Sequence, residues 1–269
     1  MKRHKITYHE LQEFLNKLYP ADLAEEWDKV GSHFGQASSQ VHRIMTALDV
    51  RPEVVEEAIS REVDTLVVHH PPIFYDIRRL DESFPDVAMY KQLIKADMNV
   101  FAMHTNLDRA QNGMNDWLAQ ALDLEEVYSL QDDDGNIDIP RIGRLKTPLS
   151  QVSLLKYLKE KLKVENITYI EKEEKAEYQT VAVVGGAGIS CLDQIKAAGA
   201  DVFITGDISY HQGHQALDSD MLVIDASHYI ESVYNQAMAQ VLNQAKVKKQ
   251  WDVEILSSEV STNPFQYYK

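Results

Sequence analysis

Apolar and polar residues follow two rhythms along this chain. In residues 8–20, four apolar positions recur at helical spacing, which predicts an amphipathic helix that ends before Pro20. Short apolar runs then alternate with helical stretches, a pattern typical of βαβ units and a mainly parallel sheet. In the first half of the chain, strands are expected at 42–50, 64–70 and 99–104, and helices at 52–62, 86–96 and 113–122.

The same rhythm returns after a more charged and less regular centre, 126–175. In this centre and beyond, strands are expected at 141–146, 166–170, 180–186, 201–206 and 221–226, and helices at 149–162, 192–200, 211–217 and 231–244. The sequence therefore predicts an α/β fold with two lobes, approximately 1–125 and 176–269. We expect the lobes and the variable centre to form a single domain over 1–269.

Composition narrows the class of protein. The 269 residues are 44% hydrophobic and can bury a sizeable core. With 42 acidic and 27 basic residues the net charge is −15, and such a surface repels phosphate backbones, so nucleic acid is not expected as a partner. Cys191 is the single cysteine, which excludes an intrachain disulfide. No apolar run suits a membrane span or a signal peptide, so we expect a cytoplasmic protein.

Histidines gather where the predicted strands end. In parallel α/β sheets, ligands bind outside the carboxyl ends of the strands, because the loops there converge over a rigid platform. Six of the ten histidines lie at or just beyond such ends, with several carboxylates beside them. These residues are His69, His70, His104, His211, His214 and His228, with Asp108, Asp207 and Glu231.

Imidazole and carboxylate groups together suit zinc, manganese, iron or nickel. His69 and His70 would point oppositely in a regular strand, but in a turn each can serve a different ion. Asp108 can bridge two ions with its two oxygens, while His228 and Glu231 share a helical face. Capping and turn roles are the alternative for each residue alone. The set as a whole predicts a site for two divalent metal ions.

A glycine-rich turn at 185–190 is a second candidate. Such a turn can hold a phosphate at a helix N-terminus, but Cys191 stands where the dinucleotide fingerprint requires glycine. A tight strand-to-helix connection is the favoured interpretation, with Cys191 as a small buried residue. The segment around Trp27 and Asp28 is expected to form a loop that either folds over the site or only packs and turns.

Several motifs together resemble the Nif-three-like family, often called GTP cyclohydrolase 1 type 2 homologues. They are EEWDKVG, VVHHPPIF, HTNLD with GMND, VAVVGGAG, FITGDISYH, DASHYIE and NPF, and in order they span nearly the whole chain. The resemblance implies a two-lobed α/β fold and a toroidal homohexamer with metal pairs facing an interior cavity. Its metal-ligand pattern falls on His69, His70, Asp108, His228 and Glu231, with His104 and His211 beside them in catalytic or supporting roles.

The resemblance makes a metal-dependent hydrolase with a dinuclear metal centre the leading interpretation. GTP is a possible small-molecule substrate, and His104 or His211 would transfer protons. Two other interpretations stay open, namely a two-metal phosphoester hydrolase and a non-catalytic metal-binding chaperone or regulatory scaffold. The centre, 126–175, leaves no room for the larger insertion that some family members carry. The sequence assigns no residue to substrate binding.

Overall fold

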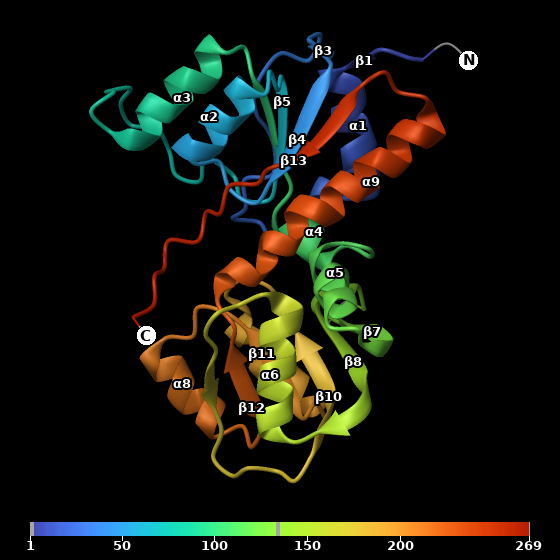
Figure 1. Cartoon of the computed structure of the whole chain (residues 1–269), viewed down its shortest axis with the longest axis vertical. Helices are drawn as coiled ribbons and strands as arrows, with labels where there is room; N and C mark the ends of the chain where they lie inside the picture. The colour runs from blue at the N-terminus through green and yellow to red at the C-terminus, as the bar shows by residue number, and fades with distance from the viewer. Residues whose placement is uncertain (1–2, 133–134, 269) are drawn as a thin grey trace. The chain divides into compact units, whose positions relative to one another are not determined.

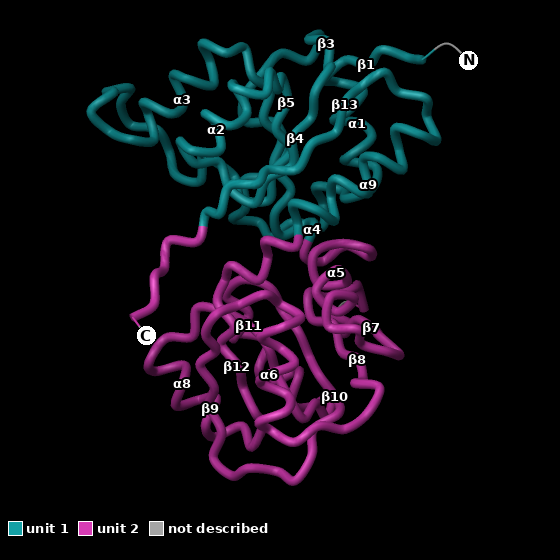
Figure 2. Tube along the Cα trace, viewed as in Figure 1, with its two compact units in different colours: residues 1–107, 234–262 teal, residues 108–233, 263–269 magenta. Residues whose placement is uncertain are grey.

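The chain divides into two compact units in the computed structural model, which describes residues 3–132 and 135–268 (Figure 2). Unit 1 comprises residues 1–107 and 234–262, and unit 2 comprises 108–233 and 263–269. These bounds differ from the lobes expected at 1–125 and 176–269, because local periodicity does not reveal which segments meet across the chain. That one domain covers the whole chain stays a prediction.

Unit 1 contains a five-stranded sheet in the order β13-β4-β5-β6-β2. Neighbouring strands are parallel except for β2, which pairs antiparallel with β6. Strands β1 and β3 form a separate antiparallel pair. The elements are β1 (Ile6–Thr7), α1 (Tyr8–Leu18), η1 (Ala21–Leu23), β2 (Gly31–Phe34), β3 (Gln40–Val41), β4 (Arg43–Ala47), α2 (Pro52–Ser60), β5 (Thr65–Val68), α3 (Pro85–Lys95), β6 (Asn99–Ala102), α9 (Val233–Lys249) and β13 (Glu254–Ser257).

Helices cover both faces of this sheet (Figure 1). Apolar residues of α2 and α3 share one buried cluster with Met45, Leu66 and Val100 of the strands. On the other face, the hydroxyl of Thr46 in β4 donates to the carbonyl of Asn235 in α9 at 2.6 Å. The parallel strands are therefore buried on both sides, which explains their uninterrupted apolar character in the sequence.

Unit 2 contains a six-stranded sheet in the order β7-β8-β10-β11-β12-β9. The pairs β10–β11 and β11–β12 are parallel, whereas the other three pairs are antiparallel. The elements are α4 (Thr105–Arg109), in which the chain passes from unit 1 to unit 2, α5 (Met114–Ala121), β7 (Glu125–Gln131), β8 (Ile137–Leu149), α6 (Gln151–Leu162), β9 (Thr168–Ile170), β10 (Tyr178–Val183), η2 (Gly188–Cys191), α7 (Leu192–Ala197), β11 (Val202–Thr205), α8 (Tyr210–Leu217), β12 (Leu222–Asp225) and η3 (His228–Ser232).

The α/β fold with two sheet-containing parts is confirmed, with two corrections to its details. The sheet of unit 2 is mixed rather than mainly parallel, because β7, β8 and β9 from the charged centre add antiparallel strands at its edges. The segment expected as a loop around Trp27 continues into the short strand β2. Within the described residues, no helix combines the length and apolar character needed to cross a membrane.

Tyr178 ties the start of β10 to the segment after β9. Its buried hydroxyl donates to Glu171 and accepts a hydrogen bond from the backbone N–H of Lys175 at 2.8 Å. Burial, together with the bond to Glu171, raises the pKa of Tyr178 from 10.0 to about 12.

A raised tyrosine pKa means that the folded state favours the neutral hydroxyl. The resulting stabilisation is complete below pH 10 and is lost as the pH rises from 10 to about 12. We expect urea titrations in this range to show a smaller loss of unfolding free energy for Tyr178→Phe than for the unmodified chain. Equal losses in the two proteins would refute this role of Tyr178.

Candidate metal centre

Three parallel strands of unit 1 end at the same level. Ala47 in β4 pairs with Val68 in β5, and Val68 pairs with Ala102 in β6. Residues that directly follow these strands are therefore brought to one edge of the sheet. They are Asp49 after β4, His69 and His70 after β5, and His104 after β6.

His69, His70 and His104 form one cluster at this edge. A nitrogen from each ring lies within 4.8 Å of the others. The ring of His69 is centred 4.8 Å from that of His70 and 5.2 Å from that of His104. His69 is fully buried, while the other two side chains are about one-fifth exposed. Three converging imidazoles are a donor set that suits zinc and other transition metals.

Each of the three rings is held at Nδ1 by an oxygen atom. These oxygens belong to the carbonyl of Met103 for His69, at 2.8 Å, to Asp49 for His70, at 2.7 Å, and to Asp28 for His104, at 2.8 Å. A carbonyl or carboxylate oxygen only accepts, so Nδ1 carries the hydrogen and donates it. In a neutral ring the lone pair is then on Nε2, the arrangement in which metal-binding histidines are typically held.

Asp28 orients His104 from the segment that precedes β2. Its buried carboxylate also accepts hydrogen bonds from the backbone N–H of Thr105, at 2.9 Å, and from the hydroxyl of the same residue, at 2.5 Å. Burial opposes the ionisation of Asp28, but the bonds from His104 and Thr105 outweigh it and hold the pKa of this carboxyl well below its ordinary value. The neighbouring Trp27 ring contacts Phe74 and His104, with centroid distances of 5.9 and 6.0 Å.

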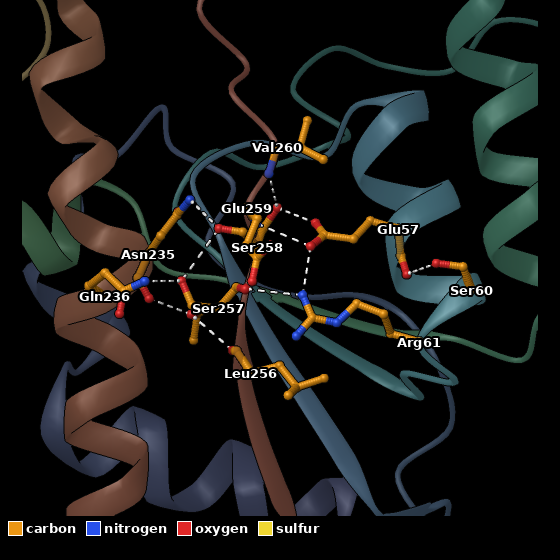
Figure 3. A network of polar contacts seen from close by, with 11 residues as sticks. Glu57, Ser60, Arg61, Asn235, Gln236, Leu256, Ser257, Ser258, Glu259 and Val260 are labelled. Atoms are coloured by element: carbon orange, nitrogen blue, oxygen red, sulfur yellow. Dashed lines mark hydrogen bonds and ion pairs between the residues drawn. The ribbon is translucent and has the colours of Figure 1, made fainter.

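The segment after β13 is fixed against α2 by a polar network (Figure 3). Glu57 accepts the hydroxyl of Ser258 at 2.5 Å and the backbone N–H of Glu259 at 3.1 Å. Arg61 donates at 2.7 Å to Oε1 of Glu57, the same oxygen that accepts the N–H of Glu259. The network directs the chain toward Thr262, whose hydroxyl donates to Asp49, the acceptor of His70.

Thr262 is expected to influence His70 through Asp49. Thr262→Val keeps the shape of the side chain and removes the donor, so the Asp49 carboxylate loses part of its orientation. We expect zinc affinity to fall about 10-fold, the lower end of the effect of changing an outer partner of a ligand. Isothermal titration with zinc measures this, and Thr262→Ser should restore the affinity. Unchanged affinity in Thr262→Val would exclude the role.

The parallel strands of unit 2 repeat this arrangement. Val183 in β10 pairs with Ile204 in β11, which pairs with Ile224 in β12. The residues that follow these strands again lie at one edge. They are Gly185 and Gly186 after β10, Asp207 after β11, and His228 with Glu231 after β12.

His228 and Glu231 lie together because the chain forms the short 3₁₀ helix η3 here. Side chains three residues apart eclipse in such a helix, and Nε2 of His228 lies 3.1 Å from Oε2 of Glu231. Nδ1 of His228 donates to Asp207 at 2.7 Å, so this ring is held like the three of unit 1. Glu231 is buried, and its oxygen and the histidine nitrogen form a second pair of candidate ligand atoms.

The glycine turn makes room for Glu231. A Cβ added to Gly185 would lie 2.8 Å from Oε1 of Glu231, and one added to Gly186 would lie 3.0 Å from it. Gly186 also has a φ of +62°, which side chains disfavour. The turn is thus a tight strand-to-helix connection, as the sequence predicts, and its glycines also leave space for the carboxylate of Glu231. Cys191 is buried, as expected.

The turn that carries Asp108 is fixed by hydrogen bonds to its backbone carbonyls. The side-chain amide of Asn115 donates to the carbonyl of Asp108 at 3.1 Å and accepts the N–H of Gly185 at 2.8 Å. Arg141, which is 1% exposed, donates to the carbonyls of the next two residues, Arg109 and Ala110, at 3.0 and 2.9 Å. The turn that carries Asp108 is therefore fixed to the rest of unit 2.

His211 lies apart from this arrangement. It is exposed on α8, and its ring contacts that of Tyr210 with a centroid distance of 5.5 Å. Within the described part of the chain, no hydrogen bond or ion pair joins His211 to His228 or Glu231. The participation of His211 in proton transfer stays a prediction.

Sequence reasoning missed several residues that hold the candidate ligands in place. Asp49 had a usable signal, because it lies at the carboxyl end of the expected strand 42–50, the kind of position that also holds His69. Thr262, Asn115 and Arg141 had none, since their partners are distant in the sequence.

Comparison with known proteins supports a family assignment. The sequence profile of the family described as Duf34/NIF3 (NGG1p interacting factor 3) matches residues 6–264. This chain belongs to the Duf34/NIF3 family. A curated relative from Streptococcus pneumoniae, named GTP cyclohydrolase 1 type 2 homolog, is 38% identical and covers 92% of this chain and 94% of its own length. A protein of the same name from Streptomyces coelicolor is 33% identical, with coverages of 93% and 90%.

Solved structures show the same fold as this Duf34/NIF3 chain. A Bacillus cereus protein related to NIF3 superposes with a TM-score of 0.92 at 23% identity, covering 98% of this chain and 99% of its own. A Staphylococcus aureus hypothetical protein gives 0.93 at 26% identity, with coverages of 98% and 100%. The match to a Listeria innocua relative extends over 367 residues, so that protein has segments that this chain of 269 residues lacks.

Proposed function

We propose that this protein is a metal-dependent hydrolase whose ligands are His69, His70, Asp108, His228 and Glu231. The observation that carries the proposal is the shared tautomer of the histidines. All three of these histidines donate at Nδ1 to an oxygen, at 2.7 to 2.8 Å, which directs the lone pair of a neutral ring to Nε2. The arrangement recurs at the strand ends of both units, and it is the one that positions Nε2 of a histidine for a metal ion.

The donor set fits divalent transition metals. Imidazole nitrogens with two carboxylates match zinc, manganese, iron or nickel better than calcium or magnesium, which prefer oxygen ligands alone. We propose two ions per chain. Bound ions of this kind would supply Lewis-acid activation of water near neutral pH.

Residues of this chain perform the remaining tasks. Asp49 and Asp207 keep the rings of His70 and His228 in the ligand tautomer. His104 is held by Asp28 in the same tautomer, so its Nε2 can take a proton from a reacting group and return it to the leaving group. Glu231, buried beside the glycine turn, contributes negative charge that offsets a bound cation.

The names of the relatives suggest where a substrate search begins. We propose GTP as the first compound to test, followed by phosphoesters, because the same two-metal chemistry serves both. We also propose a toroidal homohexamer in the cytoplasm. Native mass spectrometry tests the assembly, which would have six times the 30.7 kDa of one chain.

The hydrolase proposal is tested by turnover with and without metal. Protein reconstituted with zinc or manganese should convert a substrate, whereas the chelator-treated protein and the His69→Ala, Glu231→Ala double variant should not. Activity that survives in the double variant would refute the ligand assignment. Metal binding without turnover of any compound in the screen would instead favour a metal-binding chaperone or regulatory scaffold over a hydrolase.

A further inference from the structure

A cavity of about 470 Å³ opens in unit 1 next to the histidine cluster. Its walls are the segment that follows His70, starting at Pro72, and the first turn of α3. Phe74 connects the cavity with the histidine cluster, since it lines the cavity and its ring centroid is 6.4 Å from that of His104. The volume lies within the usual range for small-molecule sites.

The cavity is lined by exposed aromatic rings. Tyr75 is 83% exposed, and Phe74 and Phe84 are each more than one-third exposed. Tyr90 forms the floor, where its hydroxyl donates to the carbonyl of Pro72 at 2.7 Å. Several such rings open to solvent around one cavity form an exposed apolar patch of the kind that marks a binding surface, and their faces can stack on a planar ligand.

Two neighbouring arginines add positive charge to the same wall. Arg78 and Arg79 are exposed in a chain of net charge −15, and neither forms an ion pair within the described residues. The guanidinium of Arg79 lies 5.5 Å from the centroid of the Phe84 ring. A guanidinium offers a planar fork of N–H donors that matches phosphate oxygens, so the pair is suited to a phosphate group.

Carboxylates complete the lining. Asp76 and Asp86 also border the cavity, and both are available to accept N–H groups of a ligand. The cavity therefore offers faces for stacking, donors for phosphate and acceptors for ring N–H groups. A simple phosphate ester or an apolar compound would use only one of these features.

We propose that this cavity binds an aromatic heterocycle that carries a phosphate group and presents it to the histidine cluster. The ring stacks on the exposed aromatic side chains, and Arg78 and Arg79 bind the phosphate. Phe74 connects the cavity with the histidine cluster, because its ring contacts that of His104. The proposal rests on the proposed function only in treating the bound molecule as the substrate. Nucleotides and phosphorylated pyridines share this chemistry.

The test is isothermal titration of the purified full chain, before and after chelator treatment. The probes are GMP, guanosine, inorganic phosphate and pyridoxamine phosphate. The variant is Arg78→Gln with Arg79→Gln, which changes exposed side chains outside the histidine cluster. A matched control, Lys17→Gln with Arg51→Gln, removes the same charge from exposed positions elsewhere in unit 1.

We expect GMP or pyridoxamine phosphate to bind. The probe with the higher affinity shows whether the cavity prefers a nucleotide or a phosphorylated pyridine. The double arginine variant should weaken that binding about tenfold or more, and the control should leave it unchanged. Guanosine and phosphate alone should each bind more weakly than GMP. Absence of binding by both phosphorylated rings, or equal weakening in variant and control, would overturn the proposal.

The two proposals fail separately in this experiment. Arginine-dependent binding in a protein that takes up no divalent metal would overturn the metal-dependent hydrolase and leave the cavity assignment standing. Metal uptake without arginine-dependent binding of a phosphorylated ring would overturn the cavity assignment alone.

Discussion

Glu231→Gln is expected to lower the affinity for zinc by at least about 100-fold, because a ligand is lost rather than one of its outer partners. The substitution keeps the size of the side chain and removes its negative charge. Glu231 is 2% exposed, lies 3.1 Å from Nε2 of His228 and packs on the glycine turn. The glutamine side chain is neutral, so its oxygen is a weaker ligand for a cation than a carboxylate oxygen. Its NH₂ group also replaces one of the two carboxylate oxygens and cannot bind a cation.

A matched control separates this effect from a general loss of charge. Glu173 is exposed in the turn between β9 and β10 of the same unit, so Glu173→Gln changes the net charge equally. Competition titrations with a zinc chelator give the affinity of both variants, and circular dichroism reports whether they fold. Equal zinc affinity in the folded Glu231→Gln variant and the control would show that Glu231 is not a ligand.

Arg141→Lys should reduce the unfolding free energy of the chain by about 1 to 3 kcal/mol for each buried carbonyl that loses its donor. The guanidinium binds Asp116 at 2.9 Å and the carbonyls of Arg109, Ala110 and Asp138 at 2.7 to 3.0 Å. A lysine ammonium has three donors and no planar fork, so it leaves some of these buried oxygens without a donor.

Arg141→Lys should also lower the affinity for zinc, because Arg141 binds the carbonyls of Arg109 and Ala110, which directly follow the candidate ligand Asp108. Urea unfolding measures the stability, and zinc titration of the folded variant measures the second effect. Arg144→Lys on the same strand is the control, since Arg144 is exposed and binds Gln179 through its side chain. A loss in Arg141→Lys no larger than that of the control would refute the role of Arg141.

The sequence predicted much of the fold because local signals dominate in this chain. Buried parallel strands appear as apolar runs such as TLVV and VFIT, and their carboxyl ends are marked by the histidines that follow. Since parallel strands end together, the strand pattern alone placed His69, His104 and His228 at the ends of strands. It treated the glycine turn as a separate candidate and did not connect this turn with Glu231.

The remaining features depend on contacts between distant segments. Strand β13 reads as an unremarkable stretch of sequence, and only its pairing with β4 places Thr262 near Asp49. The mixed sheet of unit 2 arises from the antiparallel pairing of β7, β8 and β9. The strands expected at 141–146 and 166–170 fall on β8 and β9, but a local pattern does not reveal the direction in which strands pair, and β7 was not expected. Arg141 resembles any other arginine in the sequence, and its burial follows from the carbonyls that the folded turn presents to it.

The measurement that tests the central claim most directly is elemental analysis of the full chain purified without a histidine tag. The account predicts about two divalent transition-metal ions per chain, or the uptake of that number when zinc or manganese is added to chelator-treated protein. Protein that contains no such metal and takes up neither ion would contradict the account, because the shared orientation of the histidines would then serve no cation.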